Sequence, residues 1–158
     1  MRLTSFVLNE SKRKFYITTP IFYVNSVPHV GHLYTALLAD AQARWQAIKG
    51  KQVIFTTGTD EHGYKIQKKA LENSVECRAY CDSISSRFKE LFQLAGIKNT
   101  DFIRTTEPRH LEAVNKFWST LVNNNFIYKS SYNGWYSVND ECFLTEEQVN
   151  YFQLFKCF

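Results

Sequence analysis

The feature that most constrains this chain is segment 28–32, PHVGH, which joins two segments of different periodicity. Segment 15–19, FYITT, is rich in β-branched and aromatic residues and predicts a strand. Beyond segment 28–32, apolar residues recur at helical spacing, namely Leu33, Leu37, Leu38, Ala41 and Trp45. We expect Trp45 to lie in the core rather than in a binding pocket. A strand that turns directly into a long helix is typical of an α/β fold.

Two histidines, His29 and His32, lie at the predicted start of this helix. A helix N-terminus offers free backbone N–H groups and the positive end of the helix dipole, which together bind anions. Residues three apart lie on one face of a helix, so both imidazoles are expected to reach the same phosphate. Gly31 between them allows a flat group to lie close to the backbone. The segment therefore predicts a nucleotide site without a lysine-bearing phosphate loop.

The rest of the chain alternates between predicted strands and helices. Segments 52–57 and 101–106 predict further strands, parallel to the first. Asn73 and Glu76 form a plausible capping pair for a long helix that Gly96 closes. We therefore predict a doubly wound parallel α/β sheet over residues 14–128. Residues 129–158 predict a second, β-rich module.

The second module contains a strong local turn signal. Asn133-Gly134 lies between Tyr132 and Trp135, and Asn-Gly between aromatic residues is a typical hairpin turn. We expect the hairpin to turn at these two residues.

Composition narrows the function classes. The chain has 158 residues, 44% of them hydrophobic, which suits a globular domain with a substantial core. A net charge of +4 without a basic stripe permits a nucleic-acid partner but does not argue for one. The apolar runs are too short for a membrane span, and four cysteines without a C-x-x-C pair argue against a zinc knuckle. The basic residues before position 15, with Glu10 among them, make a weak transit-peptide pattern.

A second polar cluster follows the strand at 52–57. Asp60, Glu61 and His62 come just after this strand, as the two histidines come just after the first. Ligands of open parallel sheets bind at the carboxyl ends of the strands, so both clusters are expected to lie at one edge. Asp60 either caps the following helix or holds a substrate ammonium group by a charge-assisted hydrogen bond. A zinc site built from the histidines lacks further ligands.

These segments resemble a known family. Segment 28–32 is similar to the "HIGH" signature of class I aminoacyl-tRNA synthetases, with Val30 in place of isoleucine. Further segments resemble methionyl-tRNA synthetases in the same order along the chain, namely 18–25 (TTPIFYVN), 57–63 (TGTDEHG), 102–106 (FIRTT) and 134–136 (GWY). The form of segment 140–143, DECF, is similar to mitochondrial and some bacterial members, which lack paired zinc cysteines.

The resemblance implies a fold and a reaction. Residues 14–128 would form the first half of a Rossmann-type catalytic domain, and residues 129–158 the start of a connective insertion. The enzyme would join methionine to ATP, carried with Mg²⁺, and pass the methionyl group to tRNA(Met). It implies no structural zinc, a monomer without membrane attachment, and the mitochondrial matrix, with a bacterial cytoplasm as the alternative.

The resemblance also implies roles for single residues. His29 and His32 would bind the ATP phosphates and stabilise the transition state, and Gly31 would accommodate the adenine. The remaining implied residues would form the methionine site, with Asp60 holding the ammonium group, and they are Ile21, Tyr23, Asp60 and His62.

One family signature is missing. The lysine-bearing KMSKS signature cannot be present in its usual form, because the only methionine is Met1. We therefore expect an N-terminal catalytic half, with little aminoacylation activity alone. A non-catalytic ATP- or methionine-binding remnant stays open, as does another nucleotidyltransferase with an H-x-G-H turn, although segment 57–63 argues against the latter.

Overall fold

The structure is a computed structural model that describes residues 13–137 and 140–149. The chain forms two compact units, Met1–Lys116 and Phe117–Phe158, with the division inside helix α4 (Pro108–Asn123). Each unit is described separately below. None of the helices in the described ranges is both long enough and apolar enough to cross a bilayer.

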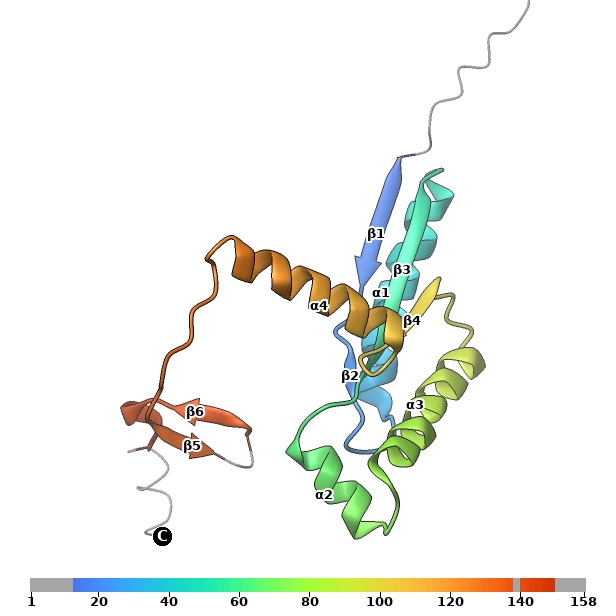
Figure 1. The fold of residues 1–158 in the computed structure, drawn as a ribbon. Coiled ribbons are helices and arrows are strands. Elements are labelled where there is room, and N and C mark those ends of the chain that lie inside the picture. The colour runs from blue at the N-terminus through green and yellow to red at the C-terminus, as the bar shows by residue number, and fades with distance from the viewer. Residues whose placement is uncertain (1–12, 138–139, 150–158) are drawn as a thin grey trace, which may run out of the picture. The chain divides into compact units, whose positions relative to one another are not determined.

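The first unit is built on a parallel sheet (Figure 1). Its strands are β1 (Lys14–Thr18), β2 (Phe22–Tyr23), β3 (Gln52–Asp60) and β4 (Asp101–Arg104). The strand β3 is central, because β1 and β2 pair with it in succession along one edge and β4 pairs along the other. Pro20 lies between β1 and β2, where it has no N–H to donate to a ladder.

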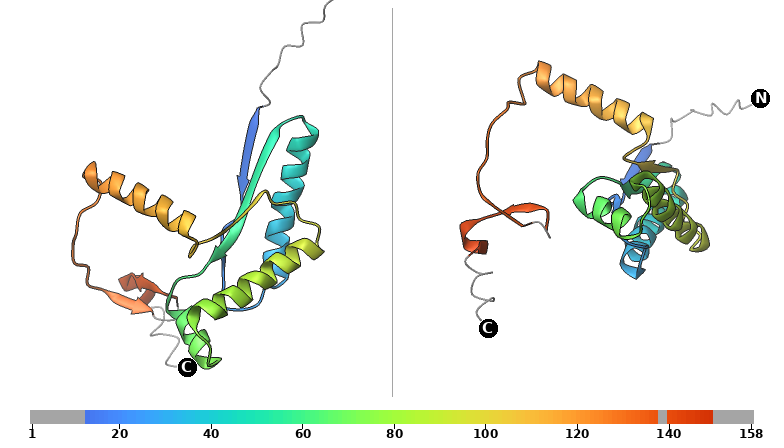
Figure 2. Two further views of the ribbon diagram at one scale, coloured as in Figure 1. Left: turned by 45° about the vertical axis from the view of Figure 1, so that its right-hand side comes forward. Right: turned by 60° about the horizontal axis from the view of Figure 1, so that its bottom comes forward.

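Three helices connect these strands. Helix α1 (Val30–Ile48) crosses from β2 to β3, and along the chain α2 (Tyr64–Glu72) and α3 (Cys77–Leu94) follow β3 and precede β4 (Figure 2). Both α1 and α3 reach one buried ring, because Phe22 of β2 contacts His32 of α1 and Phe88 of α3. The predicted parallel α/β sheet is confirmed.

Helix α1 forms as predicted, but its core residues do not include the one that was expected there. Trp45 is 52% exposed, so its predicted placement in the core was wrong, and Leu37 and Leu38 are exposed as well. The buried apolar residues of α1 are instead Ala36, Ala39 and Ala43. These small residues leave room for the aromatic core beside them, which contains Phe22, Phe55, Phe88 and Phe92.

The predicted capping of α3 is corrected in one respect. The Glu76 side chain accepts a hydrogen bond from the Ala79 N–H and caps α3 alone. Asn73 instead ends α2, where its Nδ2 donates to the Lys69 carbonyl. Gly96 follows the end of α3 with a φ of 68°, a conformation that favours glycine, as predicted.

The second unit contains the hairpin of β5 (Trp135–Ser137) and β6 (Cys142–Leu144). Ser137 pairs with Cys142, and Asn133-Gly134 precedes β5, so the prediction of a turn at Asn133-Gly134 was wrong. Gly134 precedes β5, and a Cβ there would lie 3.2 Å from the Tyr132 ring. Tyr132 packs edge-on against Phe143, with ring centroids 4.7 Å apart. Residues 1–12 and 150–158 fall outside the described residues, and they include Arg2 and Lys12 of the basic N-terminal segment.

Candidate functional site

The two histidines of segment 28–32 form the start of α1. His29 is the N-cap residue, and its Nδ1 accepts a hydrogen bond from the Gly31 N–H at 3.1 Å. The backbone N–H of His29 donates in turn to Nδ1 of His32 at 3.2 Å. The rings stack with centroids 3.7 Å apart, which confirms that both lie on one side of the helix start. The Gly31 N–H, which we expected to be free for an anion, is taken by His29 instead.

These hydrogen bonds determine where the imidazoles carry their protons. A neutral imidazole has one N–H, and a nitrogen that accepts a hydrogen bond carries no proton. Because Nδ1 is the acceptor in both rings, Nε2 is the donor in both. Burial lowers the pKa of His32, and the neighbouring His29 lowers it further, so the neutral form of His32 is favoured. In its neutral form each ring therefore presents an Nε2–H donor at the start of α1.

The predicted acidic residue Asp60 ends β3. Its Oδ1 accepts a hydrogen bond from the backbone N–H of His62 at 3.3 Å and lies 4.0 Å from the His62 Nδ1. Asp60 does not cap α2, because the N-cap of that helix is Gly63, which has no side-chain cap. The carboxylate is partly exposed, with 42% of the side chain accessible, so a cationic group can reach it.

The strand β2 brings a further predicted residue beside Asp60. Tyr23 is half-buried and is the register partner of Asp60 across the β2–β3 ladder. The ladder continues past β2, because the Val24 N–H donates to the Asp60 carbonyl at 3.2 Å. Ile21 precedes β2 and is 41% exposed. The predicted residues thus lie on β2 or just before it, at the end of β3 or just after it, and at the helix start that follows β2.

A buried ion pair underlies this edge of the sheet, and the sequence did not predict it. The Glu61 side chain is fully buried and accepts hydrogen bonds from Arg104 Nε at 2.6 Å, from Thr59 Oγ1 at 3.0 Å, and from Thr106. Burial acts to raise the pKa of Glu61, but these hydrogen bonds outweigh it and hold the pKa below its ordinary value. The sequence feature that could have revealed this ion pair is the arginine-threonine run at 104–106, at the end of the strand that pairs with β3.

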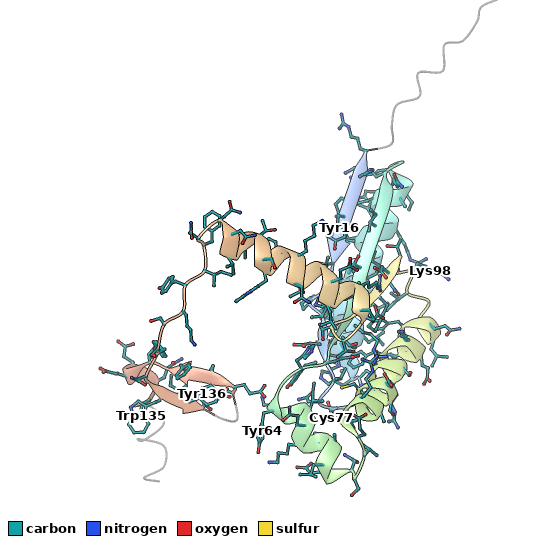
Figure 3. The ribbon with its side chains drawn as sticks, in the orientation of Figure 1. Tyr16, Tyr64, Cys77, Lys98, Trp135 and Tyr136 are labelled. Atoms are coloured by element: carbon teal, nitrogen blue, oxygen red, sulfur yellow. The ribbon has the colours of Figure 1, made fainter. Side chains whose placement is uncertain are left out.

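The thiols offer no metal site within the described residues. Cys77 is exposed at the start of α3 (Figure 3), whereas Cys81, one turn later, is buried. Burial, and after it the charge of the Glu61 carboxylate, raise the pKa of the Cys81 thiol to about 11. No cluster of three potential metal-ligating side chains occurs in the described ranges.

A separate cavity of about 510 Å³ lies beneath the loop that precedes His29. It is lined by loop residues 25–27 and by residues of α2 and α3, including Lys69, Tyr80 and Arg87. The Tyr80 hydroxyl donates to the Asn25 carbonyl at 3.1 Å, which ties this loop to α3. None of the predicted site residues lines this cavity, so its volume does not mark the site built from His29, His32 and Asp60.

Comparisons with known proteins identify the family of this chain. Residues 15–152 match the family model described as tRNA synthetases class I (M). The chain is 56% identical over 143 residues to a probable mitochondrial methionine–tRNA ligase of Dictyostelium discoideum, covering 90% of this chain and 25% of that protein. It is 48% identical over 139 residues to the methionine–tRNA ligase of Rickettsia prowazekii, covering 88% of this chain and 27% of that protein.

A solved structure supports the fold. The Mycobacterium tuberculosis methionyl-tRNA synthetase in complex with methionyl-adenylate matches with a TM-score of 0.81 and 39% identity, covering 85% of this chain and 26% of that one. The chain thus spans about a quarter of the length of the proteins it matches. The predicted fold class and family are confirmed, and the chain belongs to the class I tRNA synthetases of the methionyl (M) type.

Proposed function

We propose that this chain serves methionine–tRNA ligase activity, in which L-methionine is activated by ATP to methionyl-adenylate and transferred to tRNA(Met). The observation that carries the proposal is the pair of stacked imidazoles at the start of α1, both with Nε2 as donor. The similar solved synthetase holds methionyl-adenylate, and the relatives named above are methionine–tRNA ligases.

The geometry suits the activation step. A methionine carboxylate oxygen attacks the α-phosphorus of ATP, the bond to the bridging oxygen breaks, and pyrophosphate leaves. Negative charge develops on the phosphate oxygens, and the N–H donors of His29 and His32 stabilise it. Gly31 admits the adenine close to the backbone. Mg²⁺ accompanies the ATP phosphates as part of the substrate.

The methionine site is proposed at the carboxyl ends of β2 and β3. The partly exposed Asp60 carboxylate accepts hydrogen bonds from the substrate ammonium group. Tyr23, its register partner, and Ile21 contact the methionine side chain, and His62 shapes the same pocket. No side-chain nucleophile is required, because the substrate carboxylate is the nucleophile and the chain positions it.

Calorimetric titration with L-methionine tests the proposal. Wild-type chain is expected to bind methionine, and Asp60→Asn to bind about tenfold or more weakly, because the carboxylate charge that pairs with the substrate ammonium group is lost. Glu90→Gln removes the same charge from an exposed position on α3 and is the matched control, with affinity unchanged. A folded chain that binds no methionine, or equal binding by Asp60→Asn, would contradict the proposed site.

We further propose that the protein acts as a monomer in the mitochondrial matrix. Mitochondrial ligases of Dictyostelium discoideum and Homo sapiens, at 56% and 53% identity, support this compartment, although Rickettsia proteins match at 48%. Organelle fractionation and light scattering test the two statements.

A further inference from the structure

Thr105 lies at the point where β3 and β4 end, and its hydroxyl joins them. The residue follows β4 directly and is 6% exposed. Its Oγ1 accepts a hydrogen bond from the Glu61 N–H at 2.9 Å. The same oxygen lies 3.0 Å from Nδ1 of His62, a residue 43 positions earlier in the chain.

The partners of this hydroxyl determine where its proton points. Oγ1 already accepts from Glu61, so its own hydrogen needs an acceptor. Within residues 13–137 and 140–149, the other hydrogen-bond partner of Oγ1 is Nδ1 of His62. Buried hydroxyl groups rarely leave the proton without a partner, so the hydroxyl donates to Nδ1. A neutral His62 then carries its proton on Nε2.

We propose that Thr105 is a positioning residue that holds His62 as the neutral imidazole protonated on Nε2, so that His62 presents an N–H donor to an anionic oxygen of the substrate. The substrate part rests on the proposed function, whereas the position of the proton does not. His62 would then match His29 and His32, whose Nδ1 atoms also accept hydrogen bonds. All three rings would then carry their proton on Nε2.

Asp60 explains why a positioning residue is needed. Its Oδ1 lies 4.0 Å from Nδ1 of His62 and favours a proton on that nitrogen. The Thr105 hydroxyl is closer to Nδ1, at 3.0 Å, and as a donor it excludes that proton. Without the hydroxyl, we expect Nδ1 to become protonated toward Asp60.

Long-range ¹H–¹⁵N spectra of the histidine rings, recorded above the histidine pKa at about pH 8, test the proposal. Wild-type His62 is expected to show a protonated Nε2 and an unprotonated Nδ1. Thr105→Val should shift the proton of His62 to Nδ1, and Thr105→Ser should retain the wild-type pattern. The chain has four histidines, so His29, His32 and His110 serve as internal references that should not change.

The wild-type spectrum is decisive even if Thr105→Val does not fold, because a wild-type His62 protonated on Nδ1 overturns the proposal. A Thr105→Val spectrum identical to wild type would also overturn it. Titration with L-methionine alone and with ATP alone then identifies the anionic oxygen as a carboxylate or a phosphate. If both ligands bind and neither shifts the His62 Nε2 signal, the donor role is wrong. If neither binds, the proposed function fails while the ligand-free result stands.

Discussion

The Glu61 carboxylate receives two hydrogen bonds from the Arg104 guanidinium, at 2.6 Å from Nε and 3.1 Å from Nη2. The pair joins the end of β3 to the end of β4, and Arg104 also donates to Asp82 of α3. It therefore fixes the backbone on which Asp60 and His62 lie, one residue to either side of Glu61.

Arg104→Met is expected to lower the free energy of unfolding by about 3 kcal/mol or more, because it leaves the buried Glu61 carboxylate unpaired. Urea unfolding followed by circular dichroism measures this loss. Arg109→Met is the matched control, since Arg109 pairs with Asp101 and Glu107 at the surface and should matter much less. Equal losses in the two variants would show that burial of the pair is unimportant.

The same pair predicts how stability depends on pH. The folded chain holds the pKa of Glu61 below its ordinary value of 4.5, so the ionised form stabilises the fold fully above about pH 4.5. This stabilisation is lost as the pH falls through the lower folded value. In Glu61→Gln, the free energy of unfolding should be smaller at neutral pH and should fall less steeply with acidification. Parallel profiles for wild type and variant would refute the prediction.

Gly31→Ala is expected to separate folding from ligand binding. A Cβ at Gly31 would lie 3.0 Å from Cε1 and 3.1 Å from Nδ1 of His29, so the ring must move. Alanine is the better helix former, so the far-UV spectrum should be unchanged. ATP affinity should fall about tenfold, through the misplaced imidazole. Gln42→Ala, exposed on the same helix, should leave ATP affinity unchanged, and an unaffected Gly31→Ala would contradict the proposed phosphate site.

Gly58→Ala is expected to destabilise the sheet by about 3 kcal/mol or more. Gly58 pairs with Ile103 between β3 and β4, and a Cβ there would lie 2.0 Å from the Ile103 carbonyl oxygen. The Ile103 backbone cannot move aside without breaking the hydrogen bonds between β3 and β4. Gly134→Ala is the control, because its Cβ meets ring atoms that can turn away. Thermal unfolding compares the two, and a melting temperature for Gly58→Ala equal to wild type would exclude this close contact.

Local signals predicted the parts of this fold that local interactions determine. The histidine pair was placed correctly at the start of α1, because capping depends on residues within three positions of each other. The end of α3 was predicted for the same reason, since Gly96 adopts a conformation that few other residues tolerate.

Features that depend on distant residues were missed. The buried face of α1 is an alanine stripe at nearly the same spacing as its leucines, and only the aromatic core beside it decides between the two faces. Asn133-Gly134 is a strong turn signal, yet Gly134 precedes β5 and lies beside the Tyr132 ring. Thr105 and His62 are 43 residues apart, so their contact follows from strand order rather than from any motif.

The capping of α1 by His29 and His32 has a consequence for affinity. Each imidazole is immobilised by a backbone N–H and by its neighbour's ring, so its rotational freedom is lost when the chain folds. When a ligand binds later, the rings need not be ordered again, so less of the interaction free energy is lost to entropy and the affinity is higher. The same two side chains thus start the helix and preorganise the binding site.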